Sequence, residues 1–200
     1  TSEVLKDYMG LYDPTTNSGV VHVADYRDVP GTQLWSWGTA SSGRLWCKRL
    51  TDNDDCYVEL QTGAVETQNQ FNFLEPHNSV LFKEYWLYSS DNGPLCAASK
   101  DVICSYTIKD GRIDFSLIST DRFPKTDLVL YSGGREVFRK GVDLDPRSNT
   151  EVSVSFSIEW MDSDIEVVLI CGRDVLLRET VLENDSALEM IDREEYVPTH

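Results

Sequence analysis

The sequence predicts an all-β protein made of two successive β domains, and three observations support this. Apolar and polar residues alternate over short segments, as in half-buried strands. Clusters of Gly, Pro, Asn, Asp and Ser separate these segments at short intervals. Helical periodicity is nearly absent. Residues 185–195 are the one helix candidate of any length, with Ser186 and Glu189 spaced as in a capping box.

Charge restricts the classes of partner. The 200 residues carry 18 basic and 34 acidic side chains, a net charge of −16. This argues against nucleic acid, whose backbone requires a basic surface, and against anionic membranes. No apolar run approaches the roughly 18 residues that a membrane-spanning helix needs. The composition fits a neutral ligand such as a carbohydrate, or a basic partner protein, or a surface that is acidic only for solubility.

The five cysteines predict reduced thiols in a cytoplasmic protein. None lies in a C-x-x-C pair, and no His/Cys/Asp cluster has metal-ligand spacing, so we expect no metal and no cofactor. Cys104 and Cys171 lie in apolar strand-like segments, where a free cysteine behaves as a small hydrophobe. A bridge between Cys47 and Cys56 stays open as an alternative.

Strands are expected early in the chain at 20–25, 33–38 and 57–61. Alternation places Gln33, Trp35 and Trp37 on one face of the second of these strands. Two tryptophans at this spacing usually pack a core; alternatively they line a groove and stack on a sugar ring. Residues 39–56 are polar. Their acidic stretch, 52–55, predicts a solvated loop rather than a calcium site.

The strand at 57–61 carries the most suggestive polar residues. Tyr57, Glu59 and Gln61 share one of its faces. Carboxylates and amides bind sugar hydroxyls, and aromatic rings cover the apolar faces of sugars. The pattern therefore favours a carbohydrate-binding face, although a half-exposed strand with polar residues outward gives the same pattern. His22, alone in its strand, is expected to be structural or solvent-facing.

Beyond a turn-rich linker at 89–94, strands and turns alternate evenly. Asp110-Gly111 and Gly133-Gly134 are hairpin turns. Seven short strands with this spacing are typical of an immunoglobulin-like β-sandwich, which we place at 93–180. Residues 181–200 are an acidic tail or a short helix. The expected strands are Val102–Ile108, Arg112–Ser119, Asp127–Tyr131, Arg135–Lys140, Thr150–Trp160, Ile165–Cys171 and Val175–Thr180.

Residues 1–92 resemble the closing half of a galactose-mutarotase-like supersandwich, as found in an uncharacterised bacterial family often fused to tetratricopeptide repeats. The strand pair 8–14 and 19–25 looks like the opening of that half. The Pro30-Gly31 turn precedes an aromatic strand, as at the family's sugar site. The strand with Glu59 looks like the one that bears the mutarotase glutamate, and is followed in the family's order by Leu74-Glu75-Pro76 and Glu84-Tyr85-Trp86.

The resemblance implies a carbohydrate-binding domain of a larger protein, with a hexose or oligosaccharide as ligand. It implies that Glu59 is the general base that takes a proton from the anomeric hydroxyl, while Gln33, Trp35, Trp37 and Gln61 hold the sugar. The catalytic histidines come from the family's earlier half, so we expect little or no catalysis from this chain alone. A missing N-terminal half or a second chain should cover exposed apolar surface. The alternative is a non-catalytic scaffold or protein-interaction module.

Overall fold

The computed structural model describes residues 6–155, 160 and 163–182, and these confirm the all-β class. Contacts divide the chain into two compact units, residues 1–11 with 22–86 and residues 12–21 with 87–200. The expected C-terminal helix or tail lies outside the described residues, apart from Val181 and Leu182, which end the last strand.

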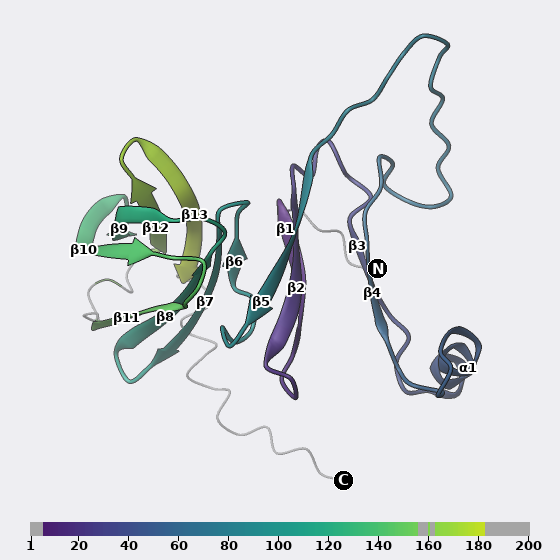
Figure 1. Ribbon diagram of the computed structural model, residues 1–200, viewed down its shortest axis with the longest axis horizontal. Helices are drawn as coiled ribbons and strands as arrows, with labels where there is room; N and C mark the ends of the chain where they lie inside the picture. Colours follow the sequence, from purple (N-terminus) through teal and green to yellow (C-terminus); the bar gives the residue numbers. More distant parts are fainter. Residues whose placement is uncertain (1–5, 156–159, 161–162, 183–200) are drawn as a thin grey trace. The chain divides into compact units, whose positions relative to one another are not determined.

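The chain up to residue 92 contains five strands and one helix (Figure 1). Three strands form a sheet in the order β1-β2-β5, and two form the pair β3-β4. Between β4 and β5, residues 62–83 form no helix or strand. The elements are β1 (Tyr8–Asp13), β2 (Ser18–Ala24), β3 (Gln33–Ser36), α1 (Ser41–Leu50), β4 (Val58–Gln61) and β5 (Glu84–Ser90).

Helix α1 lies in a polar stretch for which no helix was predicted, whereas the acidic stretch 52–55 that follows it is an exposed loop, as predicted. Its start lacks the usual signals, because Ala40 provides no side-chain cap and the first turn holds no acidic residue. Only Gly43 and Cys47 of the helix are buried, one turn apart, so its inward face contains no large apolar residue that would mark a helical period. At its end, the backbone N–H of Thr51 donates to the Cys47 carbonyl.

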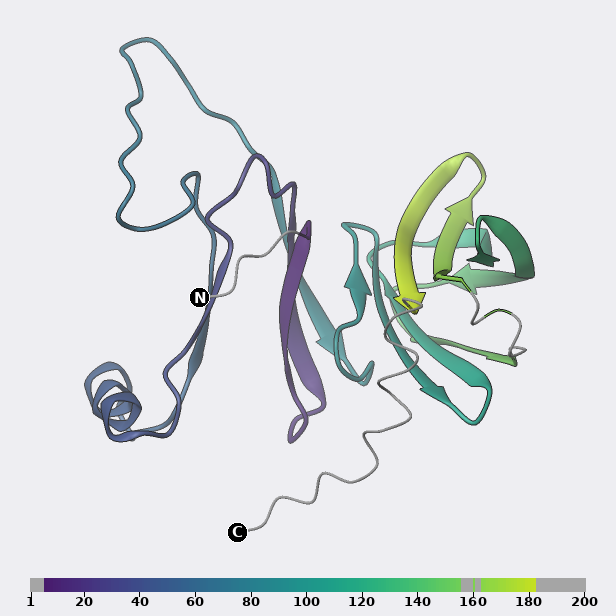
Figure 2. The same cartoon turned by 180° about the vertical axis from the view of Figure 1, so that it is seen from behind.

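The second unit contains all seven strands expected there, preceded by the short β6 (Ala97–Ala98). They form two four-stranded sheets, β11-β8-β7-β6 and β10-β9-β12-β13 (Figure 2). Successive strands change sheet after β8, β10 and β11. The strands are β7 (Val102–Lys109), β8 (Arg112–Ser119), β9 (Phe123–Ser132), β10 (Arg135–Leu144), β11 (Thr150–Ser155), β12 (Ile165–Cys171) and β13 (Asp174–Leu182).

A hydrophobic core forms from alternate residues of these strands. Along β8, every second residue from Ile113 to Ser119 is buried, and Phe115 is the largest side chain with no exposed surface. On β9 and β12 the buried set includes Leu130 and Leu169. Period-two burial on antiparallel strands is the arrangement that a β-sandwich requires. The second unit therefore has a hydrophobic core of its own between its two four-stranded sheets.

Candidate functional site

Strands β3 and β4 bring four of the five predicted site residues to one face, and the fifth, Trp37, follows β3 directly. They pair antiparallel, with Gln33 opposite Gln61 and Trp35 opposite Glu59. Directly opposite residues on antiparallel strands point to the same side of the sheet, with Cβ atoms about 5 Å apart. The register therefore places the carboxylate beside an indole and the two amides beside each other.

Four aromatic rings continue this surface toward α1. The Trp37 ring lies 6.0 Å from Trp35, 5.3 Å from Trp46 and 6.1 Å from Tyr57, measured between centroids. These separations are typical of favourable aromatic pairs. We call the surface made by Gln33, Trp35, Trp37, Trp46, Tyr57, Glu59 and Gln61 the aromatic face. Trp46 could not be assigned to this face from the sequence, because the helix that carries it was not predicted.

The helix approaches β3 closely because of one glycine. A Cβ atom on Gly43 would lie 2.2 Å from the Trp37 carbonyl oxygen and 2.3 Å from that of Gly38. Contacts this short are not sterically allowed, so only glycine permits the approach. The close packing sets Trp46 against Trp37. On its other side, the Arg49 guanidinium lies 5.6 Å from the centroid of the Trp46 ring, a cation–π contact.

The two amides are partly committed to the protein. Gln61 accepts hydrogen bonds at Oε1 from Trp35 Nε1 and from Gln68 Nε2, both at 3.0 Å. Gln33 is buried and donates from Nε2 to the Glu66 carbonyl at 2.8 Å. These bonds fix the orientation of the Trp35 ring. They leave the Gln61 amide nitrogen as the donor for a ligand, whereas Gln33 has a mainly structural role.

Glu59 differs from these neighbours because its carboxylate is exposed. Within the described part of the chain it has no hydrogen bond and no ion pair. Arg44 does not neutralise it, since Arg44 Nε donates to the Thr39 carbonyl at 3.1 Å. An exposed carboxylate opposite an indole offers free acceptors to a hydroxyl-rich ligand. It is not enclosed, so water competes for the same bonds.

The opposite face of β3 and β4 is apolar and uncovered. Leu34 and Val58 are 43% and 47% exposed. The long segment 62–83 also presents large apolar side chains to solvent, with Phe71 and Leu81 each 89% exposed.

A histidine–glutamate pair lies elsewhere in the first unit. His22 of β2 is buried, as the structural alternative predicted, and its Nε2 is 3.2 Å from Glu84 Oε2 of β5. Thr62 Oγ1 donates to the same oxygen at 2.9 Å, and the Trp86 ring lies 4.7 Å from the imidazole. Burial lowers the pKa of His22, despite the opposing effect of Glu84. The imidazole is therefore neutral near pH 7.

Burial acts on Glu84 to raise its pKa, but hydrogen bonds from Thr62, Trp86 and His22 outweigh it and the pKa is lowered. Glu84 therefore stays ionised. The pair links β2 to β5, with the imidazole buried and the Glu84 carboxylate partly exposed, and His22 has no exposed edge with which to reach a ligand. Glu84 belongs to a motif noted in the sequence, but its partner is 62 residues away.

A hollow of about 430 Å³ lies in the second unit. Tyr88, Ile118 and Arg147 are among its lining residues, and none of the five predicted site residues contributes to it. Asn149, which also lines it, donates to the Ser90 and Asp91 carbonyls and so holds the end of β5. The hollow is therefore not part of the site on β3 and β4.

The described residues include no group of three or more His, Cys, Asp or Glu side chains suited to a metal. A search of the same residues found no helix long and apolar enough to cross a membrane.

Comparison with known families divides the chain in two. Residues 2–92 match the model of a family described as a domain of unknown function, DUF5107. Residues 97–181 match the model described as YphG-like protein, second domain. No solved structure matches the chain.

Proposed function

We propose that the first unit is a carbohydrate-binding, mutarotase-like domain of a larger protein, and that the aromatic face holds a hexose or oligosaccharide. The observation that carries the proposal is the register that sets Glu59 opposite Trp35. A sugar ring has an apolar face and a rim of hydroxyls, so it needs a flat ring surface beside acceptors and donors. Trp35 provides the ring, Glu59 the acceptor and Gln61 the amide donor.

Little or no catalysis is proposed for this chain alone. Opening a sugar ring by mutarotation needs a base and an acid, each with a pKa suited to its role. Glu59 is the candidate base. Among the described residues no histidine joins it on the aromatic face, since His22 is buried against Glu84 and His77 lies in the segment between β4 and β5. The acid would have to come from another polypeptide segment.

The test is a titration of the full chain with hexoses and short oligosaccharides, in which binding is measured by tryptophan fluorescence and by calorimetry. Loss of the stacking ring in Trp35→Ala should weaken binding about tenfold, equivalent to about 1.4 kcal/mol. Glu59→Gln should weaken it by a similar factor. Leu34→Ala, on the same strand but the opposite face, is the matched control and should bind normally.

Saturable sugar binding that is unchanged in both Trp35→Ala and Glu59→Gln would remove the aromatic face from the proposal. Complete absence of binding would favour the second candidate function, a protein-interaction module. The exposed apolar side chains of Leu34, Val58, Phe71 and Leu81 favour that alternative. Their partner would be a missing N-terminal half or a second chain, and a concentration-dependent mass in light scattering would indicate the latter.

A further inference from the structure

Two thiols meet beside the aromatic face. The Sγ atoms of Cys47 and Cys56 are 3.1 Å apart, and both cysteines are free. A disulfide has a bond of about 2.05 Å, so a movement of about 1 Å would bring the sulfurs to bonding distance. Cys47 is buried in the last turns of α1, whereas Cys56 is exposed just before β4.

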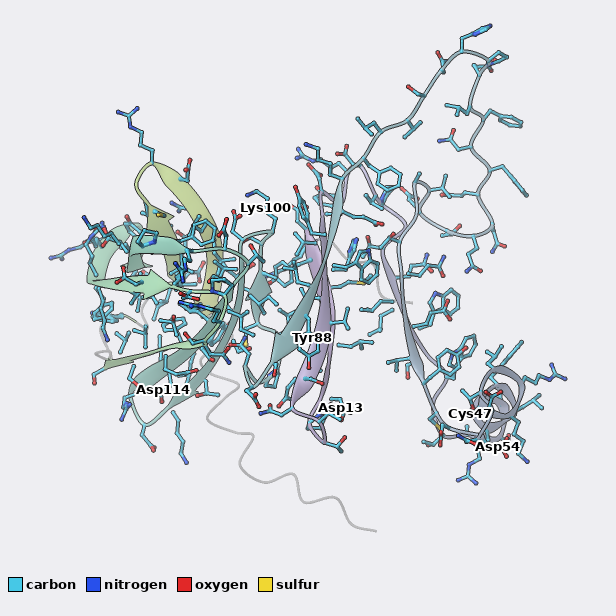
Figure 3. All side chains as sticks on the ribbon, in the orientation of Figure 1. Asp13, Cys47, Asp54, Tyr88, Lys100 and Asp114 are labelled. Atoms are coloured by element: carbon cyan, nitrogen blue, oxygen red, sulfur yellow. The ribbon has the colours of Figure 1, made fainter. Side chains whose placement is uncertain are left out.

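The connecting loop keeps these thiols together. The Thr51 hydroxyl lies 2.8 Å from the Cys47 carbonyl oxygen and 3.1 Å from that of Asp55, so it links the end of α1 to the residue before Cys56. Asp54 takes a left-handed conformation, φ 58°, which reverses the chain. Figure 3 shows Cys47 and Asp54 together at the end of the helix. The conformation of the loop at 51–55 therefore holds the Cys47 and Cys56 thiols close together.

We propose that Cys47 and Cys56 form a reversible disulfide that fixes α1, and with it Trp46, on the aromatic face. The oxidant is a hydroperoxide. The Cys56 thiolate attacks the peroxide and becomes a sulfenic acid as hydroxide leaves; the Cys47 thiol then displaces water from that sulfur. In total, two thiols and one hydrogen peroxide give one disulfide and two waters. A thiol reductant returns both cysteines to the free state.

The surroundings assign the two roles. Cys56 is exposed and can meet a peroxide, whereas Cys47 is buried. The hydrogen bond to Cys56, together with burial, raises the pKa of the Cys47 thiol, which suits the resolving rather than the attacking sulfur. Elsewhere, burial in the sandwich raises the pKa of Cys104 and makes it a poor competitor.

The bond would have a structural effect because α1 is weakly held. The helix lacks a side-chain cap at its start, and only two of its residues are buried. It contacts the segment after β3 through the close approach of Gly43 and the tilted ring pair of Trp46 and Trp37. A covalent link from its last turns to the start of β4 would limit how far the helix can leave. This inference concerns the order of α1 and does not depend on sugar binding.

The test uses the full chain in its native state. The protein is reduced, treated with hydrogen peroxide, blocked with N-ethylmaleimide and digested with trypsin. Cleavage after Arg44, Lys48 and Arg49 separates the two cysteines, so a disulfide joins peptides 45–48 and 50–83. We expect this linked pair to be the dominant product, to vanish on reduction and in Cys56→Ser, and to persist in the control Cys171→Ser.

Hydrogen exchange then tests the effect on structure. Amides of α1 should exchange at least about tenfold more slowly in the oxidised than in the reduced chain, because the link suppresses local opening. Equal exchange rates in the two states would overturn the proposed effect. Absence of the linked peptides from the oxidised wild-type chain, or preferential linkage to another cysteine, would overturn the proposed bond.

Discussion

Replacing Gly43 by alanine tests whether the close approach of α1 organises the aromatic face. Two effects oppose each other. In an exposed helix, Gly→Ala is stabilising by about 1 kcal/mol. Here the new Cβ would lie 2.2 Å from the Trp37 carbonyl oxygen, and the contacting atoms are backbone atoms that cannot rotate away. The helix would have to move by roughly 1 Å, and such overpacking costs about 1–3 kcal/mol.

The displacement should also weaken the tilted ring contact between Trp46 and Trp37, and such aromatic pairs contribute about 0.5–1.5 kcal/mol. The clash and the lost ring contact exceed the gain in helix propensity, so we expect Gly43→Ala to destabilise the first unit by about 2 kcal/mol. Urea unfolding followed by tryptophan fluorescence measures this, since four of the five tryptophans lie in that unit. Near-UV circular dichroism reports the Trp37–Trp46 contact directly.

Ser42→Ala is the matched control for this prediction. Ser42 is exposed in the same turn of α1 and should gain a few tenths of a kcal/mol from helix propensity alone. If Gly43→Ala proves as stable as Ser42→Ala and keeps the near-UV signal, the approach of α1 to β3 is not as described, and the place of Trp46 in the aromatic face is refuted.

Two further predictions concern the buried parts of each unit. Because burial lowers the pKa of His22, the unfolded chain binds more protons than the folded one below about pH 6.5, so the first unit loses stability as the pH falls through that value. His22→Gln should remove this dependence in urea midpoints taken at pH 7.5 and 5.5, with exposed His77→Gln as control; an unchanged slope would contradict it. In the second unit, Phe115→Ala should lower the free energy of unfolding by about 3–5 kcal/mol. Urea unfolding followed by the fluorescence of Trp160 measures this, and a loss below about 1 kcal/mol would show that the core is not packed around this ring.

The sandwich domain could be predicted from the sequence because its signals are local. The Lys109-Asp110-Gly111 turn shows the reason. Asp110 and Gly111 have φ values of 51° and 71°, as a type I′ hairpin turn requires, and these residue types tolerate that conformation. In β8, alternation alone identifies the inward side chains. Residue type and period two are enough to predict strands and turns where a strand pairs with the strand that precedes or follows it in the sequence.

Helix α1 could not be predicted because it is held by tertiary contacts and not by signals in its own sequence. Its buried positions are a glycine and a cysteine, and neither marks a helical period. The reason for Gly43 is visible only when the Trp37 and Gly38 carbonyls are placed against it. The same holds for His22, whose partner Glu84 is 62 residues away. A contact between distant segments leaves little trace in the pattern of either segment.

The candidate site falls between these cases. Alternation gave Gln33 and Trp35 a common face on β3, and Glu59 and Gln61 a common face on β4, as the register has them, whereas Trp37 lies just beyond the end of β3. Alternation along one strand cannot give the register between two strands, and the register is what sets Glu59 opposite Trp35. Nor could it reveal that Gln33 would be occupied by the Glu66 carbonyl.

The two proposed functions need not compete, because they concern opposite faces of the same strand pair. A two-stranded sheet is marginally stable alone and needs cover on its apolar side. Leu34 and Val58 leave that side exposed, and the chemistry that would cover it is apolar protein surface. The side with Trp35 and Glu59 combines a ring with an unpaired carboxylate, which apolar protein would cover only by burying that charge at a cost. A sugar leaves such a carboxylate solvated or hydrogen-bonded. The proposal is thus a protein partner on the face that carries Leu34 and Val58, and a hydroxyl-rich ligand on the face that carries Trp35 and Glu59.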